Sequence, residues 1–375
     1  MSRTTSARAG ETRSGWLFVT PVVVILGLFL VAPILMAFWV SLSDWAGRGS
    51  PLSGAVTFVG GQNYTDLLGQ DSLARSDFAT SIRNNFYYVL LVVPLQTVLA
   101  LGLALLLNQR RLKGLSFFRT SYYFPTVTSS VAIGSVFLFL FAGSGSVNAL
   151  LKLVGVSGPN WFADPRGLLH LLLGAVGVGN GDEQGPAALT DHGFLSLSWW
   201  DWLAGPSVAM ITIIALVIWV SAGAYMLMFL AALQNIPAEV FEAAAIDGAS
   251  TWRRTVSVTI PLLRPTLFTV LTLGLIGTWQ VFDQIYVMSK GNPSKTTLTP
   301  AYLAYDSSIN QGAWGQGTAI SFVLFAIILV MTGIQSWILR DRDKPRRRLG
   351  RAQRGGAGTG GDVGGYLATA GRQQR

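Results

Sequence analysis

Six stretches of this chain carry no charged residue and are each long enough to cross a lipid bilayer. They cover residues 17–42, 86–107, 120–142, 203–233, 265–282 and 317–339. A transmembrane helix needs about 20 mainly apolar residues, and a helix satisfies its own backbone hydrogen bonds where lipid offers none. Only 12% of the residues are charged, whereas soluble domains carry about 25%. The sequence therefore predicts an all-α integral membrane protein with six transmembrane helices.

Two stretches bear on that count. The first apolar stretch could be a cleaved signal peptide, but it is too long and no small-residue cleavage site is obvious, so we interpret it as a retained helix. Residues 167–179, GLLHLLLGAVGVG, have a length that is typical of re-entrant or interfacial segments. Counting them as a seventh span would also place the ten basic residues of the C-terminal tail outside, against the charge rule.

The distribution of basic residues predicts the orientation, because Lys and Arg are enriched in cytoplasmic loops. With the N-terminus inside, 20 of the 27 Lys and Arg residues fall on the cytoplasmic side. They are Arg3, Arg8, Arg13, Arg110, Arg111, Lys113, Arg119, Arg253, Arg254, Arg264 and ten residues from Arg340 onward. We therefore expect both termini in the cytoplasm.

The chain divides into a basic N-terminus (1–16), a six-helix membrane domain (17–339) and a tail (340–375). The tail is rich in Arg and Gly, and we expect it to be disordered against anionic lipid. The longest outside loop covers residues 143–202 and ends in the sequence WWDW at Trp199–Trp202. Tryptophan favours the membrane interface, so WWDW is read as an interfacial anchor, with a ligand-facing patch as the alternative.

Several kinds of chemistry are excluded by missing residues. The chain has no cysteine, and its two histidines, His170 and His192, lack metal-ligand spacing. No Gly-Lys dipeptide occurs, so there is no phosphate-binding P-loop, and the hydrolase motifs HExxH and GxSxG are also missing. Much of the net charge of +9 sits in the tail, which is a membrane-flank pattern rather than a nucleic-acid face. We expect no catalytic residue, no metal site and no nucleic-acid partner.

The cytoplasmic loop at residues 235–264 has the pattern of two short helices joined by a turn. Pro237 is a favourable first helical residue, and Gly248 offers the left-handed residue that ends the first helix. Ser250 can cap a second helix, which Pro261 would stop at the membrane. From helix physics alone, an ordinary connecting hairpin is the preferred interpretation of this loop, because capped hairpins commonly connect helices.

The loop nevertheless resembles that of binding-protein-dependent ABC importer permeases. Their motif is EAA, two residues, DGA, and a proline fourteen residues after the aspartate. It is matched here by Glu242-Ala243-Ala244, Asp247-Gly248-Ala249 and Pro261. Flanking segments such as NFYYVLLVVPLQTVLALGLALLLN and QVFDQIYVMSKGNPS are similar to the maltose-type sugar branch of that family. Two departures are Thr255, where a large apolar residue is usual, and residues 167–198, which look like an insertion.

The resemblance implies a multi-pass subunit in the plasma or inner membrane of a prokaryote. It would import a sugar or oligosaccharide delivered by an external solute-binding protein, together with a second, homologous permease and two ATP-binding cassette subunits. ATP and magnesium would bind to the partner ATPase, and this chain would bind no cofactor. The residues implied in coupling to the ATPase are Glu239, Glu242, Ala243, Ala244, Asp247, Gly248, Ala249 and Pro261.

Polar residues in or next to the spans are candidates for the substrate path, because burying them in lipid without partners costs several kcal/mol. These candidates are Gln96, Trp279, Gln280, Asp283, Gln284 and Tyr286. Amide and carboxylate groups can bind sugar hydroxyls, and an aromatic face can stack on a sugar ring. The alternative roles are hydrogen bonding between helices for Gln96 and solvation at the interface for Asp283. The sequence leaves the solute open to a polyol, a glycerophosphodiester or a peptide, and it leaves a self-contained secondary transporter as a rival function.

Overall fold

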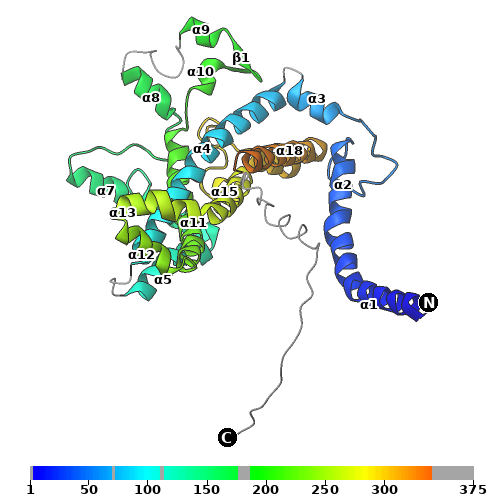
Figure 1. The fold of residues 1–375 in the computed structure, drawn as a ribbon. Helices are drawn as coiled ribbons and strands as arrows, with labels where there is room; N and C mark the ends of the chain where they lie inside the picture. The colour runs from blue at the N-terminus through cyan, green and yellow to red at the C-terminus, as the bar shows by residue number, and fades with distance from the viewer. Residues whose placement is uncertain (1–2, 70–71, 110–113, 176–185, 340–375) are drawn as a thin grey trace, which may run out of the picture.

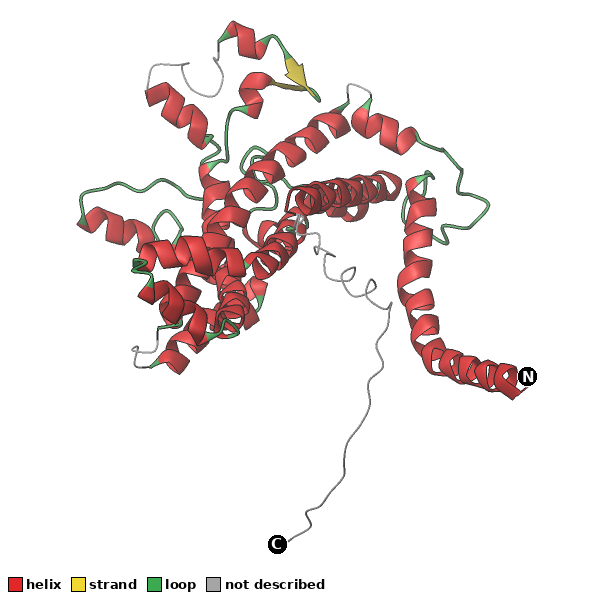
Figure 2. Cartoon of the chain, viewed as in Figure 1, coloured by secondary structure: helices red, strands yellow, loops and turns green. Residues whose placement is uncertain are grey.

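The computed structural model describes residues 3–69, 72–109, 114–175 and 186–339, which fold almost entirely into helices (Figure 2). The first half contains α1 (Arg3–Leu26), η1 (Gly27–Val31), α2 (Ala32–Ser41), α3 (Gln62–Leu68), α4 (Leu73–Leu107), α5 (Leu115–Val127), α6 (Ser130–Leu140) and α7 (Ser146–Leu153). The loop predicted to lie outside adds α8 (Leu168–Ala175), α9 (Ala187–Thr190), β1 (Gly193–Phe194), β2 (Leu197–Ser198) and α10 (Trp199–Trp202), with β1 and β2 pairing antiparallel.

The second half starts with the long helix α11 (Val208–Gln234). It continues with α12 (Ala238–Ile246), α13 (Thr251–Arg254), η2 (Thr255–Thr259), α14 (Ile260–Leu262), α15 (Arg264–Trp279), α16 (Asp283–Met288), α17 (Pro300–Tyr305), η3 (Asp306–Asn310) and α18 (Trp314–Leu339). The three η segments are short π-helical turns. The tail at 340–375 and the basic residues Arg110, Arg111 and Lys113, on which two predictions rest, lie outside the described residues.

Within the described residues, four helices are long and apolar enough to cross a membrane, or six if two bent pairs each count as one span. The four are Gly15–Ser41, α4, α11 and α18, and the bent pairs are α5 with α6 and Thr251–Leu262 with α15. The six predicted stretches lie largely within these segments, so the all-helical membrane fold is confirmed. The number of crossings depends on how the bent pairs are counted.

The third predicted span is bent by 98° between α5 and α6. Thr128 takes an extended conformation there, and its hydroxyl donates to the Phe124 carbonyl at 2.9 Å, which satisfies one of the open carbonyls at the end of α5. The charge-free stretch gave no sign of this bend, because hydropathy does not report the backbone conformation at Thr128.

Helices α4, α11 and α15 form the centre of the structure (Figure 1). One apolar cluster includes Tyr88 and Met210, and a second includes Ala104 and Phe229. Small residues allow close helix approach: a Cβ on Gly223 of α11 would lie 2.1 Å from the Tyr122 carbonyl of α5. Such contacts are typical of membrane helices, whose association depends on close packing.

The N-terminal helical stretch α1–η1–α2 stands beside this centre rather than in it (Figure 1). It meets the rest of the chain mainly through α2 and α18, where the rings of Phe38 and Phe322 lie 5.5 Å apart. Leu17 and Phe18 are 73% and 85% exposed. Apolar exposure on this scale indicates contact with lipid or with another membrane helix.

The loops predicted to lie outside and in the cytoplasm occupy different ends of the structure. Figure 1 shows α8, α9 and β1 at the top, whereas α12 lies beside the start of α5 at the lower left. The described part of the rejected seventh span forms α8, whose eight residues extend about 12 Å, far short of a bilayer. Its His170 is buried and stacks on Trp200 of the WWDW segment at 4.3 Å, so Trp200 packs inside the loop.

Candidate functional site

The first candidate site is the loop formed by α12 and α13. Gly248 follows α12 with a φ of +71°, and the Ala249 N–H donates to the Ala244 carbonyl at 3.0 Å, which closes the predicted turn. The Ser250 hydroxyl accepts from the Arg253 N–H at 3.3 Å and so caps α13. Pro237, predicted as the first helical residue, takes the N-cap position of α12 instead, and the helix begins one residue later, at Ala238.

Pro261 does not end the second helix, contrary to the prediction. The π-helical turn η2 precedes it, α14 includes it, and the break falls at Leu263, where the helix axis turns by 71° into α15. In an α-helix, a proline ring clashes with the carbonyl four residues earlier, and a π-helical turn gives that carbonyl more room. Thr255 starts this turn, and its hydroxyl donates to the Thr251 carbonyl at 3.0 Å.

This loop presents a mixed acidic and apolar surface. Glu239, Glu242 and Asp247 are exposed, and the described residues leave no side chain of α12 buried. Beside the acids, Ile246 is 86% and Trp252 is 77% exposed. These two apolar side chains were not predicted as site residues. The signal that could have identified them is their position in the sequence, since each lies near the turn at Gly248. Ala243 is exposed, and Ala244 and Ala249 are half-buried.

The second candidate site is a cavity of about 250 Å³ between α4, α11, α15 and α16. Its lining includes four of the six residues predicted for the substrate path, namely Gln96, Gln280, Asp283 and Gln284. It also includes Tyr88, Ser221, Tyr225 and Thr278, which the sequence analysis missed. A hydroxyl in the middle of a charge-free span was the signal that could have identified them.

Gln96 occupies the buried wall of this cavity. Its side chain is 1% exposed, and its Oε1 accepts from the Ser221 hydroxyl at 2.6 Å. Its Nε2 has no hydrogen-bond partner in the described structure and faces Gly274, where a Cβ would lie 2.6 Å away. Buried polar groups are nearly always paired, so an unpaired amide on a cavity wall is available to a solute. The predicted bond between helices and the predicted role in the path are therefore both compatible with its position.

The other two predicted residues do not line the cavity. Trp279 is buried beside Leu324 and Ile328 of α18, and its indole N–H has no partner among the described residues. Tyr286 is 41% exposed and packs with three other aromatic rings. The described residues contain no cluster of His, Cys, Asp or Glu that could hold a metal ion.

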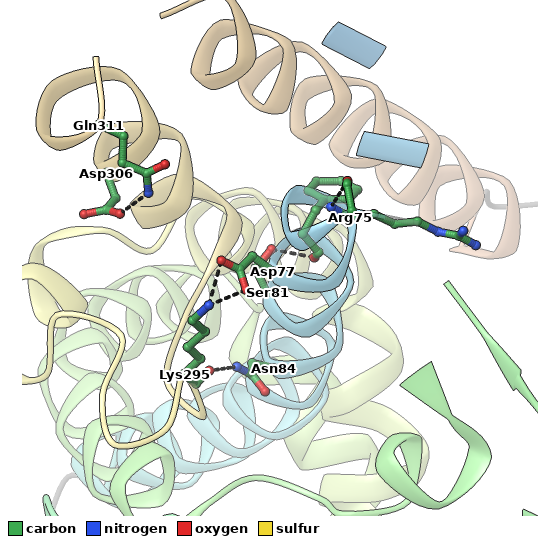
Figure 3. Close-up of polar contacts among 9 residues, drawn as sticks. Arg75, Asp77, Ser81, Asn84, Lys295, Asp306 and Gln311 are labelled. Atoms are coloured by element: carbon green, nitrogen blue, oxygen red, sulfur yellow. Dashed lines mark hydrogen bonds and ion pairs between the residues drawn. The ribbon is translucent and has the colours of Figure 1, made fainter. Parts of the chain in front are cut away.

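The segment between α16 and α17 is held against α4 by hydrogen bonds and an ion pair. The Asn84 amide donates to the carbonyls of Lys295 and Leu298 at 2.8 and 3.0 Å, and Lys295 Nζ forms an ion pair with Asp77 at 2.6 Å (Figure 3). Asn84 is 4% exposed, whereas the Lys295 side chain is 56% exposed. The buried amide therefore holds this segment more firmly than the exposed ion pair does.

We expect Asn84→Ala to loosen this segment, because the loss of a buried partner leaves two carbonyls unsatisfied at a cost of about 1–3 kcal/mol. Trypsin cleavage after Lys290 and Lys295 should accelerate in membranes that carry this variant. The matched control is Asp77→Asn, which removes only the exposed ion pair, worth about 0–1 kcal/mol. Equal cleavage rates in the two variants would contradict this account.

Comparison with known proteins identifies the family of this chain. Residues 74–344 match the family described as "Binding-protein-dependent transport system inner membrane component". The lactose transport system permease protein of Rhizobium radiobacter is 30% identical over 333 residues, which are 88% of this chain and 95% of the relative. The trehalose/maltose transport system permease protein of Thermococcus litoralis is 30% identical over 330 residues, 88% of this chain and 94% of the relative.

A solved structure has the same fold. It is a bacterial ABC transporter involved in the import of the acidic polysaccharide alginate, with a TM-score of 0.67 at 18% identity. The match covers 90% of this chain and 100% of the solved chain. The motif around Glu242, the helical membrane fold and these matches agree, and the chain belongs to the binding-protein-dependent transport system inner membrane components.

Proposed function

We propose that this chain is the permease subunit of an ABC importer for a sugar or oligosaccharide. The observation that carries this proposal is the cavity between the central helices, whose wall presents the unpaired amide of Gln96. The lining mixes hydroxyl, amide and carboxylate groups with aromatic rings, which suits a polyhydroxylated ring. The names of the relatives, which include lactose, trehalose and maltose, support the same class of solute.

The loop of α12 and α13 is the proposed contact with a separate ATPase subunit. Exposed Ile246 and Trp252 provide an apolar anchor, and Glu239, Glu242 and Asp247 can pair with basic groups of the partner. ATP and magnesium bind to that partner, because this sequence has no Gly-Lys dipeptide with which to form a P-loop.

Transport proceeds by alternating access. A loaded solute-binding protein docks outside, ATP closes the ATPase pair, and the loop of α12 and α13 moves with it, so that the spans rock and release the solute inward. A second, homologous permease completes the path, since six spans of one chain cannot easily enclose a path for a sugar. The crystal structure of a bacterial alginate ABC transporter in complex with a periplasmic protein that holds an alginate pentasaccharide, which this chain matches with a TM-score of 0.61, supports the proposed docking of a solute-binding protein.

The proposed orientation places six spans with both termini in the cytoplasm. The chain contains no cysteine, so a single introduced thiol reports its own side of the membrane. Ala245→Cys in α12 should react with an impermeant maleimide only in inverted vesicles, and Asp191→Cys in the outside loop only in intact spheroplasts. The cysteine-free parent is the control, and the opposite labelling of either variant would overturn the orientation.

The function is tested by purifying the chain from its native membrane in mild detergent and identifying what accompanies it. We expect a P-loop ATPase and a second permease, and vanadate-sensitive, ATP-dependent sugar uptake after reconstitution with the receptor. Recovery of the chain alone, with uptake driven by an ion gradient, would instead support a self-contained secondary transporter. The six apolar stretches of the sequence contain no charged residue that could serve as a relay in such a transporter.

A further inference from the structure

Four aromatic rings gather beside the cavity, which one of them, Phe282, also lines. Phe282 stacks on Tyr286 with the ring centroids 5.5 Å apart, and Tyr305 meets both rings edge-on at 5.2 and 5.5 Å. Tyr302 lies 6.3 Å from Phe282 and 6.3 Å from Tyr305. We call these four residues the outer aromatic platform. Phe282 and Tyr286 come from the start of α16 and from α16 itself, and Tyr302 and Tyr305 come from α17. The platform therefore depends on the packing of two helices and is a feature of the tertiary structure.

The platform is continuous with the cavity. Phe282 lines the cavity and also stacks on Tyr286, so one ring belongs to both. Tyr286 remains 41% exposed, whereas Tyr302 is 6% exposed and forms the base of the cluster. Interfacial aromatic residues are usually spread around the membrane perimeter. Rings that contact one another and lead into a polar cavity instead form a surface on which a flat solute can lie.

Oxygen acceptors flank these rings. Asp283 follows Phe282 and lines the cavity, and Asp306 follows Tyr305. The Asp306 carboxylate accepts from the amides of Asn310 and Gln311 at 2.7 and 2.8 Å, which fixes its orientation (Figure 3). Hydrogen bonding with the Tyr286 side chain raises the pKa of Tyr305 above its ordinary value. The residues that line the cavity or form the platform include no Lys, Arg or His.

We propose that the outer aromatic platform is a second binding site, which receives an uncharged sugar ring before it enters the cavity. The apolar face of the ring stacks on Tyr286 and Tyr305, and its hydroxyls donate to the carboxylates. A uronate is disfavoured, because its carboxylate would meet the carboxylates of Asp283 and Asp306, and the residues that line the cavity or form the platform offer no cation. This inference rests on the proposed function and narrows its substrate class to neutral saccharides.

Saturation-transfer NMR on the purified complex without its receptor tests the platform directly. The probes are maltose, lactose and, as the charged comparison, cellobiouronic acid. We expect transfer to the ring C–H protons of a neutral probe, and a loss of about tenfold in affinity in Tyr286→Ala, the size of one stacking contact. Tyr286→Phe keeps the ring and should retain binding. The matched control is Tyr123→Ala, since Tyr123 of α5 is 37% exposed but belongs to neither the cavity lining nor the platform.

Equal affinity of the Tyr286→Ala and Tyr123→Ala variants for a neutral probe would overturn the proposal that the platform binds sugar. Equal saturation transfer to cellobiouronic acid and to the neutral probes would also overturn it. Asp283→Asn should raise transfer to the uronate. A second readout is the number of sugar molecules imported per ATP hydrolysed, which should fall in Tyr286→Ala and not in Tyr286→Phe. If the reconstituted wild-type complex shows no ATP-dependent uptake of a sugar, the proposed function itself fails; if uptake occurs but the two alanine variants behave alike, only the platform fails.

Discussion

Replacing Gly248 with valine is expected to prevent recovery of the ATPase subunit with this chain and to stop ATP-driven uptake. Gly248 has a φ of +71°, and an L-residue in that conformation costs about 1–2 kcal/mol, with β-branched residues the least suited to it. No described atom lies within 4 Å of a Cβ placed there. The valine side chain would therefore fit the isolated loop but would project toward a partner that approaches the turn.

The matched control is Gly155→Val. Gly155 has a φ of +78° and equally open surroundings, but it lies in the loop after α7, within the segment predicted to be outside. The two variants share the backbone strain and differ in the surface they alter. Affinity purification followed by immunoblotting for the ATPase compares them. Normal ATPase recovery in Gly248→Val, or equal loss in both variants, would contradict the proposed role of the loop.

Replacing Gln96 with leucine is expected to reduce sugar uptake by about 10- to 100-fold, since a hydrogen bond to a buried group that is left unmade costs about 1–3 kcal/mol. Leucine approximates the volume of glutamine and removes the free Nε2 from the cavity wall. It also removes the acceptor of the Ser221 hydroxyl, which can turn to the Val217 carbonyl at 2.7 Å. The measurement is the uptake rate of proteoliposomes at saturating loaded receptor.

Asn85→Leu separates solute binding from helix packing. Asn85 lies on the same helix, is fully buried and donates to the Trp279 carbonyl at 3.4 Å, but it does not line the cavity. This control should lower the thermal stability of the complex and leave the uptake rate per assembled complex near that of the parent. If Asn85→Leu and Gln96→Leu lowered stability and uptake in parallel, Gln96 would be a packing residue only.

The loop around Gly248 was predictable because its signals are local. A glycine that ends a helix, a serine that caps the next one and the spacing of Glu242, Asp247 and Pro261 all act over a few residues. The prediction for Pro261 was wrong because the register of the preceding turn, η2, is not visible in the sequence. Ile246 and Trp252 were missed because their exposure depends on which faces of α12 and α13 the rest of the chain leaves uncovered.

The sequence by itself determined the helical membrane class, the approximate positions of the apolar segments and the family, since hydropathy and short motifs are properties of neighbouring residues. Only the tertiary structure decided which polar residues share a cavity. It placed Gln96 with Ser221 and separated Trp279 from Gln280, although the latter two are adjacent in the chain. It also brought Tyr305 to Tyr286. The physical reason is that consecutive helical residues point about 100° apart, so the packing of whole helices decides which side chains meet.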